Sequence, residues 1–202
     1  LERAILSPNS SNMQLWEFYW IKDPALQKDF HAYCLNQNAA KTAKQLVVFV
    51  TRQDHWKKRV QWHLDIIKKG ITGETTPNQD KLMTYYGKLM PLAYGTDQFG
   101  LLSVIRRTLS SLIGTFTPMT RMKGRADQRI TVHKSCALAA QTFMLSIAAE
   151  GFETCPMEGF DAVRVKKALN LPPMAEINMI ISVGKGTQAG IWGERNRVPY
   201  NE

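Results

Sequence analysis

The chain has 202 residues and a mass of 22.9 kDa, which suits a single domain with a core of its own. Hydrophobic residues make up 44% and charged residues 21%, and no apolar run reaches the roughly 20 residues that span a bilayer, so we exclude a membrane protein. Lys and Arg outnumber Asp and Glu by 26 to 17, and the net charge of +9 favours an anionic partner such as nucleic acid, acidic lipid or a phosphorylated small molecule.

The first residues, LERAIL, lack the charged start and the apolar core of a signal peptide and are typical of the last turns of a helix. We therefore expect an incomplete N-terminus. The next stretch, SPNSSNMQLWEF (7–18), places five small polar residues before a Trp-rich run, which is more than a turn requires.

The first third of the chain predicts two strands and two helices. The aromatic and β-branched run Trp16–Ile21 is typical of a strand, and Asp23 followed by Pro24 predicts the capped start of a helix that continues to Cys34. The continuous apolar run Leu46–Val50 predicts a central strand that is covered on both faces. Helical spacing of the apolar positions over Asp54–Lys69 predicts an amphipathic helix.

The middle of the chain, residues 73–124, is broken by Pro and Gly, and we expect helices at 79–90 and 101–113 that form a mobile cover over a substrate pocket. The segment Ile130–Ala149 is apolar on every side, which predicts a helix buried nearly all round. A domain of this size rarely surrounds a helix so fully alone, so this pattern favours a second subunit.

The last part of the chain predicts an extended, turn-rich link over 151–160, a helix over 162–170 with Asp161 as its N-cap, and a buried strand over 177–184. Residues 185–202 show no periodicity and need support from elsewhere. Strands separated by helices indicate an α+β fold with helices packed on a mixed sheet.

Four stretches carry a resemblance to a known family. SPNSSNMQLWEF is similar to the P-S-S-x-N-x-Q-P-W motif of the FMN-dependent nitroreductases, and TCPMEGFD (154–161) is similar to their P-I-E-G-F-D turn. Asn36 precedes the strand LVVFV at the spacing of the family's flavin-contacting Asn, and Arg195-Asn-Arg197-Val-Pro199 resembles its basic-x-Arg-x-Pro tail. The motifs occur in family order.

The resemblance implies an α+β nitroreductase-like fold over residues 1–202, with a mixed, mainly antiparallel sheet and a C-terminal tail exchanged across a homodimer. It implies an FMN site at the dimer interface, in which the segment from Pro8 to Asn12 lines the flavin from the partner subunit. The implied cofactor-binding residues are Pro8, Asn9, Ser10, Asn12, Asn36, Ser135, Pro156, Met157, Glu158, Gly159, Arg195 and Arg197.

The chemistry of these residue types suits FMN. Guanidinium forks, as on Arg195 and Arg197, bind phosphate well, although two arginines near a terminus are by themselves more typical of a solvated pair. The amide of Asn36 can both donate to and accept from a flavin edge, whereas a loop Asn commonly bonds its own backbone. Backbone N–H groups at Glu158 and Gly159 would face flavin N5 and O4, the alternative being a turn without a ligand.

The chain also departs from the family pattern. The family's R-x-S-x-R/K motif would lie before Leu1, and Ala39 stands where relatives have a Lys, so charge stabilisation at flavin N1 and O2 requires Lys41 or Lys44 to reach back. Asn9, Leu15 and Ser135 replace Ser, Pro and Gln.

The implied activity is a ping-pong reaction in which NADH or NADPH reduces FMN and an electron-poor acceptor, such as a nitroaromatic or a quinone, takes the hydride. No side-chain acid or base is required, so we name no catalytic residue. Tyr85, Tyr86 and Phe99 are candidates to stack on an acceptor ring, with core packing as the alternative. Other tasks for the same flavin remain open, namely dehalogenation, dehydrogenation or a biosynthetic step.

Other features carry weaker hypotheses. His55 and His63 are two helical turns apart, too far to share a metal ion without other ligands, and we expect no metal. The three cysteines form no CxxC pair, which favours a reducing compartment and a cytoplasmic location; Cys155 is more often a small hydrophobe than a reactive thiol. The basic run over 120–129, with Arg121, Lys123, Arg125 and Arg129, predicts first a solvated loop, then a site for NAD(P)H phosphates, and last a nucleic-acid-binding module, so we expect no nucleic acid partner.

Overall fold

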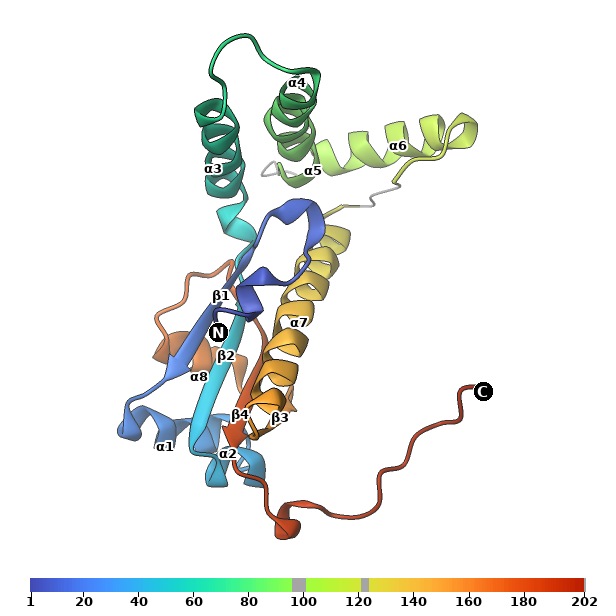
Figure 1. Ribbon diagram of the computed structural model, residues 1–202. Coiled ribbons are helices and arrows are strands. Elements are labelled where there is room, and N and C mark those ends of the chain that lie inside the picture. Colours follow the sequence, from blue (N-terminus) through green and yellow to red (C-terminus); the bar gives the residue numbers. More distant parts are fainter. Residues whose placement is uncertain (96–100, 121–123, 202) are drawn as a thin grey trace.

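The computed structural model describes residues 1–95, 101–120 and 124–201, and its centre is a four-stranded sheet in the order β1-β2-β4-β3 (Figure 1). The strands are β1 (Trp16–Ile21), β2 (Gln45–Thr51), β3 (Glu153–Met157) and β4 (Glu176–Gly184). All three strand pairs are antiparallel, so the α+β fold with a mainly antiparallel sheet is confirmed.

The apolar run of β2 is covered on both faces, as the sequence predicts. Val48 and Val50 belong to one buried cluster, whereas Val47 and Phe49 belong to another on the opposite face. Successive residues of a strand point to opposite faces, so a central strand between two cores needs apolar side chains at every position.

Helices cover the two faces of the sheet (Figure 1). One face packs against α1 (Pro24–Tyr33), α2 (Asn38–Thr42) and α8 (Ala162–Ala168). The other packs against α7 (Arg125–Ala149). The predicted caps are present, since the carboxylates of Asp23 and Asp161 accept hydrogen bonds from the backbone N–H groups of Leu26 (2.9 Å) and Arg164 (3.1 Å).

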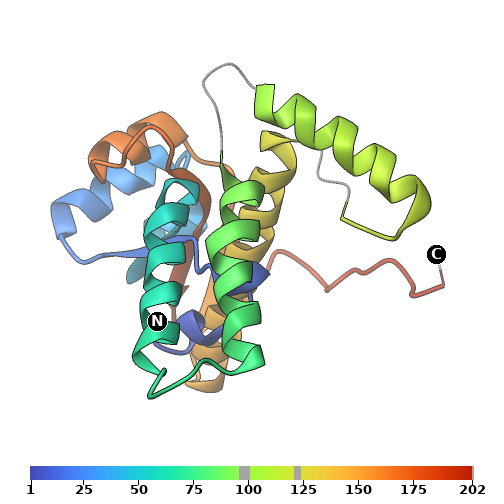
Figure 2. The same ribbon diagram turned by 90° about the horizontal axis from the view of Figure 1, so that it is seen from above.

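A third buried cluster joins the N-terminal segment to helices that follow β2. These helices lie side by side beyond the end of the sheet (Figure 1 and Figure 2). It contains Met13 and Leu15 from the N-terminal segment and Val60, Tyr86 and Met90 from the helices. From here on, the cover means the helices α3 (Trp56–Lys69), α4 (Pro77–Thr84) and α5 (Met90–Tyr94) with the π-helical turn η4 (Tyr85–Leu89). Helix α6 (Leu101–Phe116) follows them. Short 3-10 turns are η1 (Ala4–Leu6), η2 (Ser10–Asn12), η3 (Gln53–His55) and η5 (Gln188–Gly190).

Three expectations need correction. The link over 151–160 contains the edge strand β3. Its five residues include a proline, which argues against a strand in the sequence but is tolerated at the edge of a sheet. The helix expected over 79–90 is interrupted by a π-helical turn. The helix α7 is not buried all round, since Ile130, Leu138 and Leu145 are 49%, 48% and 62% exposed in the single chain. None of the helices in the described part of the chain has the length and hydropathy to span a bilayer.

Candidate functional site

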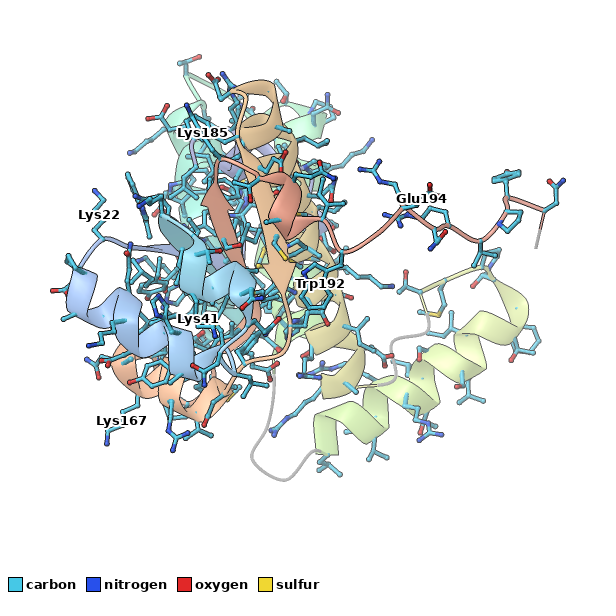
Figure 3. All side chains as sticks on the ribbon, turned by 90° about the horizontal axis from the view of Figure 1, so that it is seen from below. Lys22, Lys41, Lys167, Lys185, Trp192 and Glu194 are labelled. Atoms are coloured by element: carbon cyan, nitrogen blue, oxygen red, sulfur yellow. The ribbon has the colours of Figure 1, made fainter. Side chains whose placement is uncertain are left out.

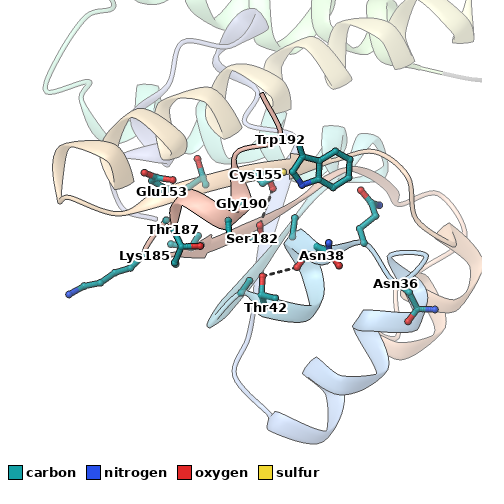
Figure 4. A pocket seen from close by; sticks show the side chains of 18 residues that line it. Asn36, Asn38, Thr42, Glu153, Cys155, Ser182, Lys185, Thr187, Gly190 and Trp192 are labelled. Carbon is teal, nitrogen blue, oxygen red and sulfur yellow. Dashed lines mark hydrogen bonds between the residues drawn. The ribbon is translucent and has the colours of Figure 1, made fainter. Parts of the chain in front are cut away.

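A cleft of about 860 Å³ lies at the end of the sheet where β2 begins and β4 ends. Its walls come from α2 and the preceding turn, from β3, from the last residues of β4 and from the start of the C-terminal tail (Figure 4). We call it the Asn36 cleft after one lining residue; the others are Gln37, Asn38, Ala39, Thr42, Ala43, Glu153, Thr154, Cys155, Ser182, Val183, Gly184, Lys185, Gly186, Thr187, Ala189, Gly190 and Trp192.

The lining combines amides and hydroxyls with apolar surface. The hydroxyl of Thr42 donates to the carbonyl of Asn38 (2.8 Å), and that of Ser182 donates to the carbonyl of Cys155 (3.3 Å), so each keeps acceptor capacity (Figure 4). Trp192 and Cys155 both line this cleft (Figure 4). A planar ligand with polar edges and an apolar end requires this combination of groups.

The structure brings together two motifs that are more than 100 residues apart. Gln37, next to Asn36, donates from Nε2 to the carbonyls of Gly159 (2.6 Å) and Cys34 (3.1 Å), and the N–H of Asp161 donates to the carbonyl of Tyr33 (2.7 Å). A Cβ on Gly159 would lie 3.2 Å from the Gln37 nitrogen. The turn after β3 is therefore attached directly to the turn that carries Asn36.

The residues at the end of β3 and in the turn after it differ in exposure. Pro156, Glu158 and Gly159 are exposed, whereas Met157 is 2% exposed and packs in the core on the α1 face. None of the predicted residues from Pro156 to Gly159 belongs to the described lining of the Asn36 cleft.

The segment from Pro8 to Asn12 lies at the opposite end of the sheet. It leads into Trp16, which pairs with Thr51 at the end of β2, whereas the Asn36 turn leads into the start of β2. Seven strand residues separate the two ends, roughly 20 Å. The side chains of Pro8, Ser10 and Asn12 are exposed.

Asn9 and Ser135 organise this segment internally. The Asn9 amide accepts from the N–H of Gln14 (2.8 Å) and donates to the carbonyl of Ser7 (3.2 Å). Ser135, 8% exposed on α7, accepts from the N–H of Ser10 (3.2 Å). The structure thus joins Ser10 to Ser135, two predicted site residues 125 positions apart.

Arg195 and Arg197 belong neither to the Asn36 cleft nor to the segment from Pro8 to Asn12. The tail from Lys185 to Asn201 is exposed at every residue, and beyond Trp192 it runs away from the body of the chain (Figure 3). The Arg197 guanidinium donates to the carbonyl of Asn196 (2.6 Å), a neighbour in the same tail. Within one chain the predicted site residues therefore form three separate groups.

The histidines and cysteines singled out in the sequence can now be placed. The described residues contain no cluster of His, Cys, Asp and Glu suited to a metal ion. Cys155 is exposed in the Asn36 cleft, so its interpretation as a buried hydrophobe is wrong, whereas Cys34 and Cys136 are buried. Burial raises the pKa of the Cys34 thiol to about 11 and that of Cys136 to about 12.

The cover residues have roles different from those expected. Tyr86 is 8% exposed and stacks on His63, so it packs in the core rather than facing a substrate ring. Phe99, like Arg121 and Lys123 of the basic run, lies outside the described residues. Arg129 of that run donates to Glu176 (2.5 Å), and hydrogen bonds from His133 and Arg129 lower the pKa of Glu176 against the effect of burial.

Ala39, the position at which the resemblance implies a Lys, lies in the wall of the cleft. The cation that lines the Asn36 cleft is Lys185, and its side chain points out of the cleft (Figure 4). Neither Lys41 nor Lys44 belongs to the described lining. Gln37 was not predicted as a site residue, and only its position beside Asn36 could have indicated it.

Chains of the same fold are known among flavin-related oxidoreductases. A Staphylococcus epidermidis protein provisionally assigned as an NAD(P)H:FMN oxidoreductase aligns with a TM-score of 0.70 at 17% identity, over 99% of this chain and 79% of that one. A provisionally assigned nitroreductase from Exiguobacterium sibiricum, solved in complex with FMN, aligns with a TM-score of 0.65 at 19% identity, over 99% and 80% of the two chains. The fold and the cleft thus define an α+β protein of nitroreductase fold.

Sequence comparison then defines the family. The nitroreductase family profile matches residues 1–185, and the chain belongs to this family of oxidoreductases. The Synechocystis protein DrgA is 26% identical over 198 residues, which cover 98% of this chain and 76% of DrgA.

Proposed function

We propose that the chain is an FMN-dependent oxidoreductase that acts as a homodimer and uses NADH or NADPH to reduce electron-poor acceptors such as nitroaromatics and quinones. The observation that carries the proposal is the Asn36 cleft, with its mixed polar and apolar lining and the Gly159 turn attached beside it. Its volume of about 860 Å³ is within the range for a cofactor site.

The donor set fits FMN. Amides at Asn36 and Asn38 and hydroxyls at Thr42 and Ser182 suit the polar edge and ribityl chain, while Ala39, Ala43 and Trp192 supply apolar surface. When bound, FMN would accept a hydride from NAD(P)H and pass it to the acceptor, with the two substrates using the site in turn.

In this proposal the residues of the chain bind the flavin and orient it. The N–H groups of the exposed residues Glu158 and Gly159 would donate to the flavin, and Gln37 holds their turn through the Gly159 carbonyl. A donor near flavin N5 stabilises the reduced, anionic cofactor. A glycine at this point lets the main chain approach a ligand closely.

A second subunit completes the site in this proposal. The segment from Pro8 to Asn12 and the Asn36 cleft lie at opposite ends of one sheet, so one chain cannot place both against the same flavin. The exposed apolar residues Ile130, Leu138 and Leu145 on α7 supply a surface for a second copy. The tail with Arg195 and Arg197 is free to reach across such an interface to the FMN phosphate, whose charge guanidinium groups neutralise.

The test is FMN binding. The purified protein should carry or take up FMN with a yellow absorption spectrum, and Arg195→Ala with Arg197→Ala should raise the FMN Kd about 100-fold, since a charge-assisted hydrogen bond contributes about tenfold per residue. Arg164→Ala is the matched control, because Arg164 is 69% exposed on α8 and pairs with Asp161. A protein that retains no flavin absorption after incubation with saturating FMN and removal of the free cofactor contradicts the proposal.

Steady-state assays would identify the electron acceptor and show whether NADH or NADPH is the preferred donor. NADH and NADPH oxidation should each be measured with nitroaromatics, quinones and halogenated phenols. Turnover of halogenated phenols alone would move the activity to dehalogenation. The cytoplasmic location stays a prediction.

A further inference from the structure

The segment from Ser10 to Gln14, which we call the flavin loop because the proposed function places it against FMN, has a strained backbone. Ser11, Asn12 and Gln14 have φ angles of 55°, 50° and 47°, in the left-handed region that residues with a Cβ rarely adopt. Three such residues within four positions persist only when the surroundings hold them.

The surroundings are side chains of the cover. The hydroxyls of Ser11 and Tyr85 are 2.6 Å apart and share a hydrogen bond, and the hydroxyl of Tyr86 donates to the carbonyl of Ser11 (3.1 Å). His63 Nε2 lies 2.8 Å from the carbonyl of Asn12, and since a carbonyl only accepts, this nitrogen carries the proton. All three bonds end on the left-handed pair Ser11 and Asn12.

The cover is built to present these groups together. Tyr85 and Tyr86 open the π-helical turn η4, whose wider coil separates successive side chains by a smaller angle than an α-helix does. Their rings meet edge to face with centroids 5.3 Å apart, and Tyr86 stacks on His63 at 4.1 Å and 9°. A π turn within α-helical surroundings is often found at a functional site.

Packing alone does not explain this arrangement. His63 and Tyr86 are 7% and 8% exposed, and a phenylalanine would fill the space of Tyr86 equally well without its hydroxyl. The polar atoms of His63 and Tyr86 instead bond the backbone of the flavin loop, whose residues Ser10 and Asn12 are exposed.

We propose that His63, Tyr85 and Tyr86 are positioning residues that hold the flavin loop in the shape its cofactor contacts require, so that the cover sets the geometry of the flavin site. This inference rests on the proposed function for the identity of the ligand. It assigns the two tyrosines to the flavin loop, without direct contact to an acceptor ring.

The expected effect follows from a near balance. Each left-handed residue disfavours the loop shape by about fivefold or more, and each hydrogen bond favours it by about fivefold. Asn9 and Ser135 hold the two ends of the loop through the N–H groups of Gln14 and Ser10, whereas the three cover bonds hold Ser11 and Asn12 at its centre. Removing two hydroxyls should therefore make the competent shape of the centre a minority state. The apparent Kd for FMN rises in proportion to that lost population, and we expect about a tenfold increase.

The experiment uses the full chain with Tyr85→Phe and Tyr86→Phe combined. FMN Kd is measured by fluorescence titration, and amide hydrogen exchange of residues 10–14 is measured without FMN. The double variant should bind FMN about tenfold more weakly and exchange these amides about tenfold faster. Tyr33→Phe, on α1 at the other face of the sheet, is the matched control and should change neither value.

Ser11→Ala is a second variant that removes the loop partner of Tyr85 and leaves the cover intact, so it decides the matter if the double variant fails to fold. Unchanged Kd and exchange in the variants overturn the inference, and so does faster exchange with unchanged FMN affinity. Wild-type protein that binds no FMN refutes the proposed function instead. In that case exchange alone decides whether the cover holds the loop, and unchanged exchange overturns this inference as well.

Discussion

Arg52 lies where the sheet meets the cover, and its replacement by alanine gives a quantitative test of how the two are joined. Its Nε and Nη2 donate to the two carboxylate oxygens of Asp54 (3.0 and 2.8 Å), and its Nη1 donates to Glu17 on β1. His55 also contacts the guanidinium. The Arg52 side chain is 12% exposed, and α3 begins at the next residue after His55.

The magnitude follows from what Arg52→Ala leaves behind. Glu17 and Asp54, 30% and 24% exposed, would face each other without a cation. Breaking a buried ion pair destabilises by about 3 to 5 kcal/mol, and the partial access of water to both carboxylates reduces the expected loss to about 2 kcal/mol. For a chain of this length that loss lowers Tm by roughly 6 °C.

The loss should depend on pH with a definite sign. Hydrogen bonds from Arg52 lower the pKa of Asp54, so their stabilisation is present above the unfolded pKa of about 4 and is lost as pH falls through the folded value. Burial and then Arg52 lower the pKa of His55, so the wild type loses stability as pH falls below about 6.5. In the variant, protonated His55 faces Asp54 and Glu17 without the guanidinium and partly replaces it. The difference between the two proteins is therefore largest at pH 7 and above and shrinks toward pH 5.

Urea unfolding of both proteins at pH 5, 6, 7 and 8 measures this difference directly. Arg164→Ala removes an arginine whose ion pair is exposed and should cost below about 0.5 kcal/mol at every pH. A loss for Arg52→Ala under about 0.5 kcal/mol at pH 7, or one that grows toward pH 5, refutes the reasoning.

Two further predictions concern accessible groups. Cys155, exposed in the Asn36 cleft, should react at once with a thiol reagent and should be protected by saturating FMN, whereas Cys34 and Cys136 should react only on unfolding; three fast thiols would contradict the burial pattern. Leu138→Glu on the exposed face of α7 should convert a dimer to a folded monomer by light scattering, while Val163→Glu, at a position 78% exposed on α8, should leave the dimer intact.

The parts of the fold that the sequence predicts are those with strong local patterns. The run Leu46–Val50 can be satisfied only between two cores, and Asp23 with Pro24 fixes the start of α1. The edge strand β3 has no such pattern, because its pairing with β4 is a long-range contact and its exposed edge places little demand on side chains. The π-helical turn at Tyr85 likewise has no local pattern, and its contact with Ser11 joins residues 74 positions apart.

The candidate site was predictable only in part. The motifs around Asn36 and Gly159 indicate flavin contacts through resemblance, but their union through Gln37 depends on how α2 meets the end of β3. Met157 shows the limit of a motif, since its neighbours are exposed while its own side chain is buried in the core.

The two ends of the sheet make different demands on the same chain. The Asn36 cleft is open and is walled mainly by regular elements, whereas the flavin loop is strained and needs the cover to hold it. The proposed homodimer would set the cleft of one subunit against the flavin loop of the other, so each site would combine the cleft wall with a loop held by the partner's cover. A change in either subunit's cover would then alter the flavin site built on the other subunit's cleft, and this coupling follows from the separation of the two groups along one sheet.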